Sequence, residues 1–110
     1  MIDETISQLE AKLKNNSSLT DDTKSELARL LSTLKTEITE LSKTNADQAQ
    51  SIAGFAQTST HEAIRQEKNP ELLKLSLDGL AASVDGFEKS HPSLVQLVNR
   101  ICTALSNLGI

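Results

Sequence analysis

The sequence contains almost no aromatic residues and very little glycine or proline. Among its 110 residues there are two phenylalanines, no tryptophan or tyrosine, four glycines and two prolines. A core without aromatic side chains has to be built from Leu, Ile, Val and Ala, which suits the packing of helices better than a β-sandwich. The shortage of glycine and proline also leaves too few residues for the sharp turns of an all-β fold. We therefore expect an all-α protein.

Clustered positive charge, paired cysteines and long apolar runs are missing as well. The net charge is −4, and the 11 basic residues are mostly interleaved with acidic ones, which disfavours nucleic-acid binding because that depends on clustered Lys and Arg. The acidic start MIDETISQ differs from a signal peptide, and no segment approaches about 18 consecutive apolar residues. A single cysteine fits a reducing compartment. These features predict a cytoplasmic protein with no nucleic-acid or membrane partner.

Apolar residues recur at alternating intervals of three and four positions along most of the chain, which is typical of amphipathic helices. A first helix is predicted at 2–14 and a second at 20–44, where Thr20 can cap the first turn. The segment 46–67 keeps the helical spacing but has a thin apolar face made mainly of alanine. The residues of this alanine face are Ala46, Ala49, Ala53, Ala56, Thr60 and Ala63. The pattern leaves open whether 20–67 is one long helix or two.

A restart of the helical pattern is predicted at Asn69 and Pro70, because Asn caps helices well and Pro is tolerated at the first helical position. The segment that follows contains two Asp-Gly pairs, at 78–79 and 85–86, a dipeptide that often marks a hairpin turn. The apolar residues keep their helical phase across both pairs. We therefore predict that both pairs lie on one helix, 70–90.

Small residues form a second stripe beside the apolar seam of this predicted helix. They are Ser76, Gly79, Ser83, Gly86 and Ser90. We hypothesise that this close-packing stripe accepts the alanine face of the preceding helix in an antiparallel pair. The alternative is that the glycines are merely tolerated on a solvated face, at a cost of roughly 1 kcal/mol each relative to alanine.

The last helix is predicted at 92–108, with Pro92 marking either a kink or a reversal of the chain. Its apolar stripe is wider than one neighbouring helix needs to cover, and Arg100 is its single charged residue. Either this helix is central in an intramolecular bundle, or it completes its burial against another chain. We therefore select a candidate interaction surface on it. Its residues are Leu94, Val95, Val98, Ile101, Leu105 and Leu108.

Residues with catalytic or metal-binding potential are few and isolated. His61 precedes a glutamate, as in zinc proteases, but Arg65 occupies the position of the second histidine. His91 is expected to cap a helix or to be partly buried. Cys102 has no nearby His or Lys in the sequence, so a small buried hydrophobic side chain is expected rather than a nucleophile. The sequence thus predicts no catalytic, cofactor-binding or metal site, and we expect a protein that is not an enzyme.

Two stretches resemble a known family. FEKSHPSLVQLVNRICTALSNLGI at 87–110 resembles the C-terminal signature of a family of small bacterial all-helical proteins classed as a domain of unknown function, and SLTDDTKSELARLL at 18–31 resembles its N-terminal part. The resemblance implies a small bacterial helical protein. Because this family is classed as a domain of unknown function, the resemblance implies no activity and no functional residues for this chain.

The sequence as a whole predicts one helical domain over 1–110, an antiparallel hairpin or bundle of four or five helices with coiled-coil-like heptad seams. The function that we favour is that of an interaction or scaffold protein that binds itself, as a homodimer, or another helical protein. The alternative is a carrier of a small apolar ligand or lipid tail in the bundle interior. Binding at a membrane surface is disfavoured by the acidic balance.

Overall fold

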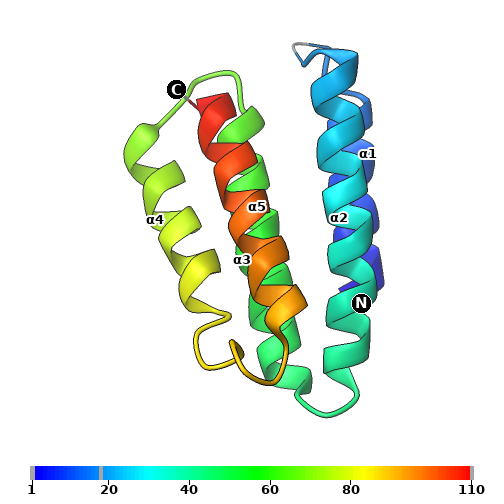
Figure 1. Ribbon diagram of the computed structural model, residues 1–110. Helices are drawn as coiled ribbons and strands as arrows, with labels where there is room; N and C mark the ends of the chain where they lie inside the picture. The colour runs from blue at the N-terminus through cyan, green and yellow to red at the C-terminus, as the bar shows by residue number, and fades with distance from the viewer. Residues whose placement is uncertain (1, 18, 110) are drawn as a thin grey trace.

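The computed structural model describes residues 2–17 and 19–109, and within that range it consists of five α-helices and their connections. The helices are α1 (Ile2–Lys14), α2 (Asp21–Ser42), α3 (Ala46–Ile64), α4 (Pro70–Ala82) and α5 (Pro92–Gly109). Successive helices run in opposite directions along the long axis of the molecule (Figure 1). The prediction of an all-α antiparallel bundle is confirmed.

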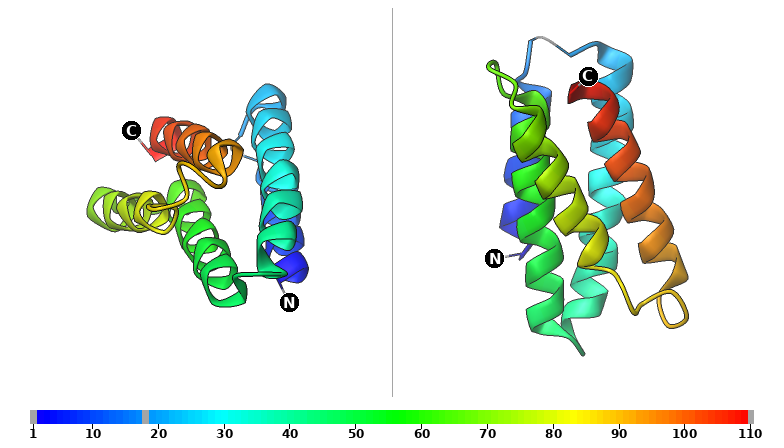
Figure 2. Two further views of the ribbon diagram at one scale, coloured as in Figure 1. Left: turned by 60° about the horizontal axis from the view of Figure 1, so that its bottom comes forward. Right: turned by 90° about the vertical axis from the view of Figure 1, so that its left-hand side faces the viewer.

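α3 is the central element of the bundle, since it contacts each of the other four helices. Figure 2 shows it between the α1–α2 pair and α4. Most of its buried side chains are small, and helices approach one another more closely where such side chains lie between them. These buried residues are Ala49, Ile52, Ala53, Ala56, Ser59, Thr60, Glu62 and Ala63. The alanine-rich composition of this helix therefore explains its place in the middle.

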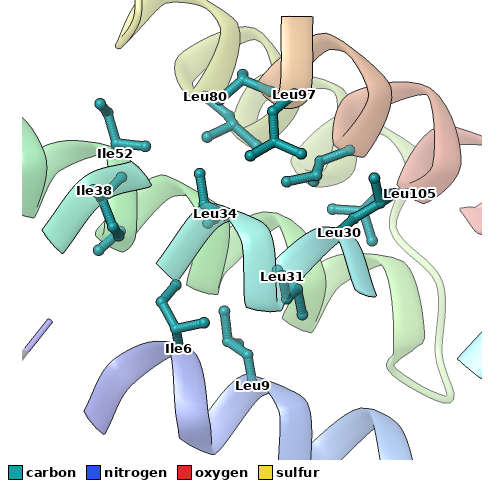
Figure 3. Packing of buried hydrophobic residues seen from close by; sticks show 14 of the residues in the cluster. Ile6, Leu9, Leu30, Leu31, Leu34, Ile38, Ile52, Leu80, Leu97 and Leu105 are labelled. Carbon is teal, nitrogen blue, oxygen red and sulfur yellow. The ribbon is translucent and has the colours of Figure 1, made fainter. Parts of the chain in front are cut away.

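The first two helices form a hairpin whose apolar faces meet the rest of the core. Thr20 caps α2, because its side chain accepts a hydrogen bond from the backbone N–H of Thr23 at 3.2 Å. In Figure 3, Leu34 of α2 lies between Ile6 of α1 and Leu80 of α4. One cluster of buried residues thus draws its members from all five helices.

The connections settle two points that the periodicity left open. Residues 43–45 reverse the chain between α2 and α3, so 20–67 is two helices and not one. α3 ends at Ile64, three residues before the predicted end, and Arg65 already has an extended backbone. α5 runs antiparallel to α4, so Pro92 begins a helix after a reversal (Figure 1).

The prediction of a single helix over 70–90 is wrong beyond Ala82, where α4 ends. The first Asp-Gly pair lies on α4, but the second lies in a series of turns, and Gly86 has a φ of 94°, a conformation that favours glycine. The apolar phase survives because Val84 is buried and Phe87 packs against the core from the connection. Side chains of a loop therefore continue the apolar pattern of the helix along the sequence.

Candidate functional site

The candidate interaction surface on α5 is not free. Leu94, Val98, Ile101 and Leu105 are fully buried, and Val95 and Leu108 are partly buried against the same core. The reason is that α2, α3 and α4 all pack against α5. Three neighbours within the chain cover a stripe that was too wide for one. The expectation that this stripe meets another chain is therefore corrected.

The close-packing stripe is divided between α4 and the connection that follows it. Ser76 and Ser83 are buried, and their hydroxyls donate to the carbonyl oxygens of the residues three positions earlier, at 2.9 and 2.6 Å. Gly86 and Ser90 are exposed and lie outside the helix. The five residues therefore do not form one helical face, because α4 ends at Ala82, before Ser83, Gly86 and Ser90.

Gly79 of the stripe lies against a side chain of α3. A Cβ atom added there would lie 2.3 Å from Cε1 of Phe55, so the absence of a side chain leaves room for that ring. Near the end of the same interface, the side-chain amide of Gln48 donates to the carbonyl oxygen of Ser83 at 2.5 Å. Both partners on α3 lie outside the alanine face. α4 thus pairs antiparallel with α3, but through a neighbouring face.

Three large apolar side chains are exposed among the described residues, and they come from α3 and α4. Phe55, Leu72 and Leu75 are 39%, 43% and 66% exposed. We call these three residues the α3–α4 apolar surface. Sequence reasoning missed it because a single seam was followed through α4. The signal was present in the run LLKLSL at 72–77, which holds more leucines than one helical face can bury.

The two histidines and the cysteine, which are the side chains most often found in catalytic and metal sites, have different surroundings in this fold. His61 is exposed, and His91 lies edge-on to Phe87 with ring centroids 5.4 Å apart. Burial, together with the nearby charge of Asp78, raises the pKa of the Cys102 thiol, which disfavours the nucleophilic thiolate. In the described part of the chain no group of three His, Cys, Asp or Glu side chains is placed to hold a metal ion.

Surface hollows lie between the described helices and loops. One, of about 480 Å³, is a groove between α2 and α5. We call it the α2–α5 groove, and its lining residues are Glu26, Arg29, Leu30, Asn99, Arg100, Thr103, Ala104 and Asn107. A second hollow, of about 440 Å³, lies where residues 15–17 meet 64–68, and a third, of about 340 Å³, lies between α1 and α2. Sequence reasoning did not predict that the two arginines of the groove lie together.

A comparison with models of protein families gives a match. Searches of the curated proteins and of the solved structures found none. Over the residues that the structure describes, no helix is both long enough and apolar enough to cross a membrane. The sequence model of one family, described as "Domain of unknown function (DUF4404)", matches residues 29–110, which include most of α2 and all of α3, α4 and α5. Ile110, the last residue of the C-terminal signature, lies outside the described residues.

The match covers well over half of the chain and leaves out α1 and the first turns of α2. The prediction that the protein belongs to a family classed as a domain of unknown function is confirmed. The chain belongs to the DUF4404 family.

Proposed function

We propose that this protein is a non-enzymatic interaction protein that associates with a second copy of itself through the α3–α4 apolar surface. The observation that carries the proposal is the exposure of Phe55, Leu72 and Leu75 on neighbouring helices, while the large side chains of α5 are buried. Exposed apolar side chains that gather on one face are typical of binding surfaces.

The position of α4 supports association at this face. Within the described residues α4 packs only against α3 and α5, whereas α3 has four neighbours. One long side of α4 is therefore left without a helical partner, and Leu75 is the most exposed of its large side chains. Another helix laid along this side would cover it in the same way as α3 and α5 cover the other sides.

The arrangement of large and small residues on α4 favours a copy of the same helix as the partner. Leu72 and Leu75 lie in its first half, whereas Gly79 and Ala82 continue the same stripe in its second half. In an antiparallel pair related by a two-fold axis, the leucines of each copy meet the smaller residues and the Phe55 ring of the other. Such a self-complementary face is what a two-fold dimer requires.

The affinity of this dimer is expected to be low. Only three large apolar side chains contribute, whereas stable interfaces bury about 1,600 Å² in total. The experiment is sedimentation equilibrium over a wide range of protein concentrations, with wild type beside Leu75→Asp. The matched control is Ser32→Asp, which adds the same charge on an exposed position of α2.

A monomer–dimer equilibrium that Leu75→Asp abolishes, while its helicity and that of Ser32→Asp stay at the wild-type level, would support the proposal. A wild type that is monomeric at every concentration would overturn it. A dimer that survives Leu75→Asp would also overturn it, because association would then use another face.

The carrier of an apolar ligand is not proposed as a second function. The three hollows described above lie on the outside of the bundle and are lined largely by polar and charged side chains. No observation favours an apolar ligand in the interior.

A further inference from the structure

The α2–α5 groove brings together two of the three arginines of the chain. Arg29 comes from α2 and Arg100 from α5, and both side chains are exposed and line the same groove. Neither guanidinium has an ion pair or hydrogen bond within the described structure, whereas Arg65, the third arginine, pairs with Glu62 at 2.9 Å. The protein as a whole has a net charge of −4, so two unpaired guanidinium groups in one hollow are a local concentration of positive charge on an acidic protein.

The groove has a defined floor and polar walls. Leu30 is buried and Ala104 partly buried at its base, and Figure 3 shows Leu30 beside Leu105 where α2 and α5 meet. Three exposed polar side chains follow one another along α5 at intervals of one helical turn. They are Asn99, Thr103 and Asn107. The volume of about 480 Å³ falls within the range of about 300–1,000 Å³ for small-molecule sites.

We propose that the α2–α5 groove binds a small anion that carries phosphate or carboxylate groups, held by Arg29 and Arg100. The guanidinium group offers a planar fork of donors that matches two oxygens of either group, and two such forks on opposite walls suit a ligand with more than one charge. The amide donors of Asn99 and Asn107 can supply additional hydrogen bonds from the α5 side. This site is separate from the α3–α4 apolar surface and does not depend on self-association.

Glu26 is the one acidic residue of the groove, three positions before Arg29 on the same helix. Its carboxylate repels an anion and lowers the affinity of the site. Replacing it by the neutral isostere is therefore expected to strengthen binding. A residue with a purely structural role would not have this effect.

The test is to titrate the full chain with three probes, inorganic phosphate, pyrophosphate and citrate. Binding is monitored by ¹H–¹⁵N NMR spectra that include the arginine Nε–H signals. Pyrophosphate and citrate distinguish phosphate from carboxylate recognition. We expect saturable shifts that centre on residues 26–30 and 99–107. Arg29→Gln and Arg100→Gln should each weaken binding by about tenfold or more, the loss expected for a charged hydrogen-bonding partner.

Lys89→Gln is the matched control, because it removes the same charge from an exposed position in the connection before α5. It should leave the affinity unchanged, and Glu26→Gln should raise it. The proposal is overturned if none of the three probes gives saturable shifts. It is equally overturned if Lys89→Gln weakens binding as much as Arg29→Gln, since the effect would then reflect net charge alone.

Discussion

Two buried hydroxyl groups in the second half of α3 lack hydrogen-bond partners among the residues that the structure describes. Ser59 and Thr60 are fully buried, and within the described structure neither Ser59 Oγ nor Thr60 Oγ1 has a hydrogen-bond partner. A hydroxyl that leaves water without a compensating hydrogen bond costs about 1–3 kcal/mol in protein mutational data. These two groups therefore lower the stability of the helix that organises the bundle.

Replacing Thr60 by valine should stabilise the protein. Valine keeps the branched shape and removes the unpaired hydroxyl, so we expect the free energy of unfolding to rise by about 1 kcal/mol in urea denaturation. Thr58→Val is the control, because Thr58 is exposed and its hydroxyl already donates to the Gly54 carbonyl at 3.1 Å. A stability of Thr60→Val at or below that of Thr58→Val would contradict this account.

Gly54 in α3 and Gly79 in α4 differ in what surrounds them. Nothing lies within 4 Å of a Cβ added at Gly54, whereas one added at Gly79 would collide with the Phe55 ring. Gly54→Ala should therefore gain up to about 1 kcal/mol from helix propensity, and Gly79→Ala should gain less or lose stability because the ring must move.

A double-mutant cycle measures this coupling between Gly79 and Phe55. In a Phe55→Ala background the obstacle is absent, so Gly79→Ala should recover the full gain seen at position 54. Equal effects of Gly79→Ala in both backgrounds would show that the ring does not restrict the site.

At the scale of the element, the starts of the helices differ in how they are capped. The side chain of Thr20 accepts from Thr23 N–H, and that of Asn69 accepts from Leu72 N–H at 3.2 Å. Asn45, at the start of α3, makes no such bond. The three residues look equally suitable in the sequence, but the side-chain amide of Asn45 donates to the hydroxyl of Thr44 at 3.1 Å instead of its oxygen capping the helix.

Alanine substitution at these three positions should lower the free energy of unfolding more where the side chain makes a capping hydrogen bond than where it does not. Thr20→Ala and Asn69→Ala should each lower the free energy of unfolding by about 1 kcal/mol, because one helix-end N–H loses its partner. Asn45→Ala should have a smaller effect, since it removes no capping bond. Thermal unfolding of the three variants checks the order, and a loss at Asn45 as large as at Asn69 would contradict it.

Helix starts were easier to predict than helix ends. The start at Pro70 followed from local chemistry, because Asn and Pro have fixed preferences there. The end of α4 at Ala82 could not be read from the apolar periodicity, since Val84 and Phe87 reach the core from a loop and imitate a continued helix. The Asp-Gly pair that contains Gly86 was the local signal for the end of this helix. The positive φ of Gly86, which is incompatible with a continued helix, is visible only in the structure.

At the scale of the whole molecule, periodicity predicts which face of a helix is apolar but not what covers it. The stripe of α5 was correctly identified as too wide for one neighbour, and three helices of the same chain cover it. Conversely, Leu72 and Leu75 share a leucine-rich segment with buried residues, yet they face outward because α4 has only two neighbours. The fold class was predictable, whereas the candidate surfaces depended on the order in which the helices assemble.

The grouping of the two arginines likewise depends on how the whole chain folds. Arg29 and Arg100 are far apart in the sequence, and nothing near either residue suggests a partner. They share a groove only because α5 returns antiparallel to α2 after the reversal at Pro92. Such a site follows from topology and not from a local motif.

The apolar stripe of α5 is buried in the core of one chain, and the proposed binding surface lies on α3 and α4. The most direct test is urea unfolding of the Val98→Asp and Leu75→Asp variants, monitored by circular dichroism. Val98 is fully buried, so an unpaired carboxylate there should remove more than about 4 kcal/mol of stability or prevent folding, whereas the exposed Leu75 should tolerate the same change within about 1 kcal/mol. A Val98→Asp protein that unfolds at the wild-type urea concentration would contradict the account, because the stripe would then be accessible to water or to another chain.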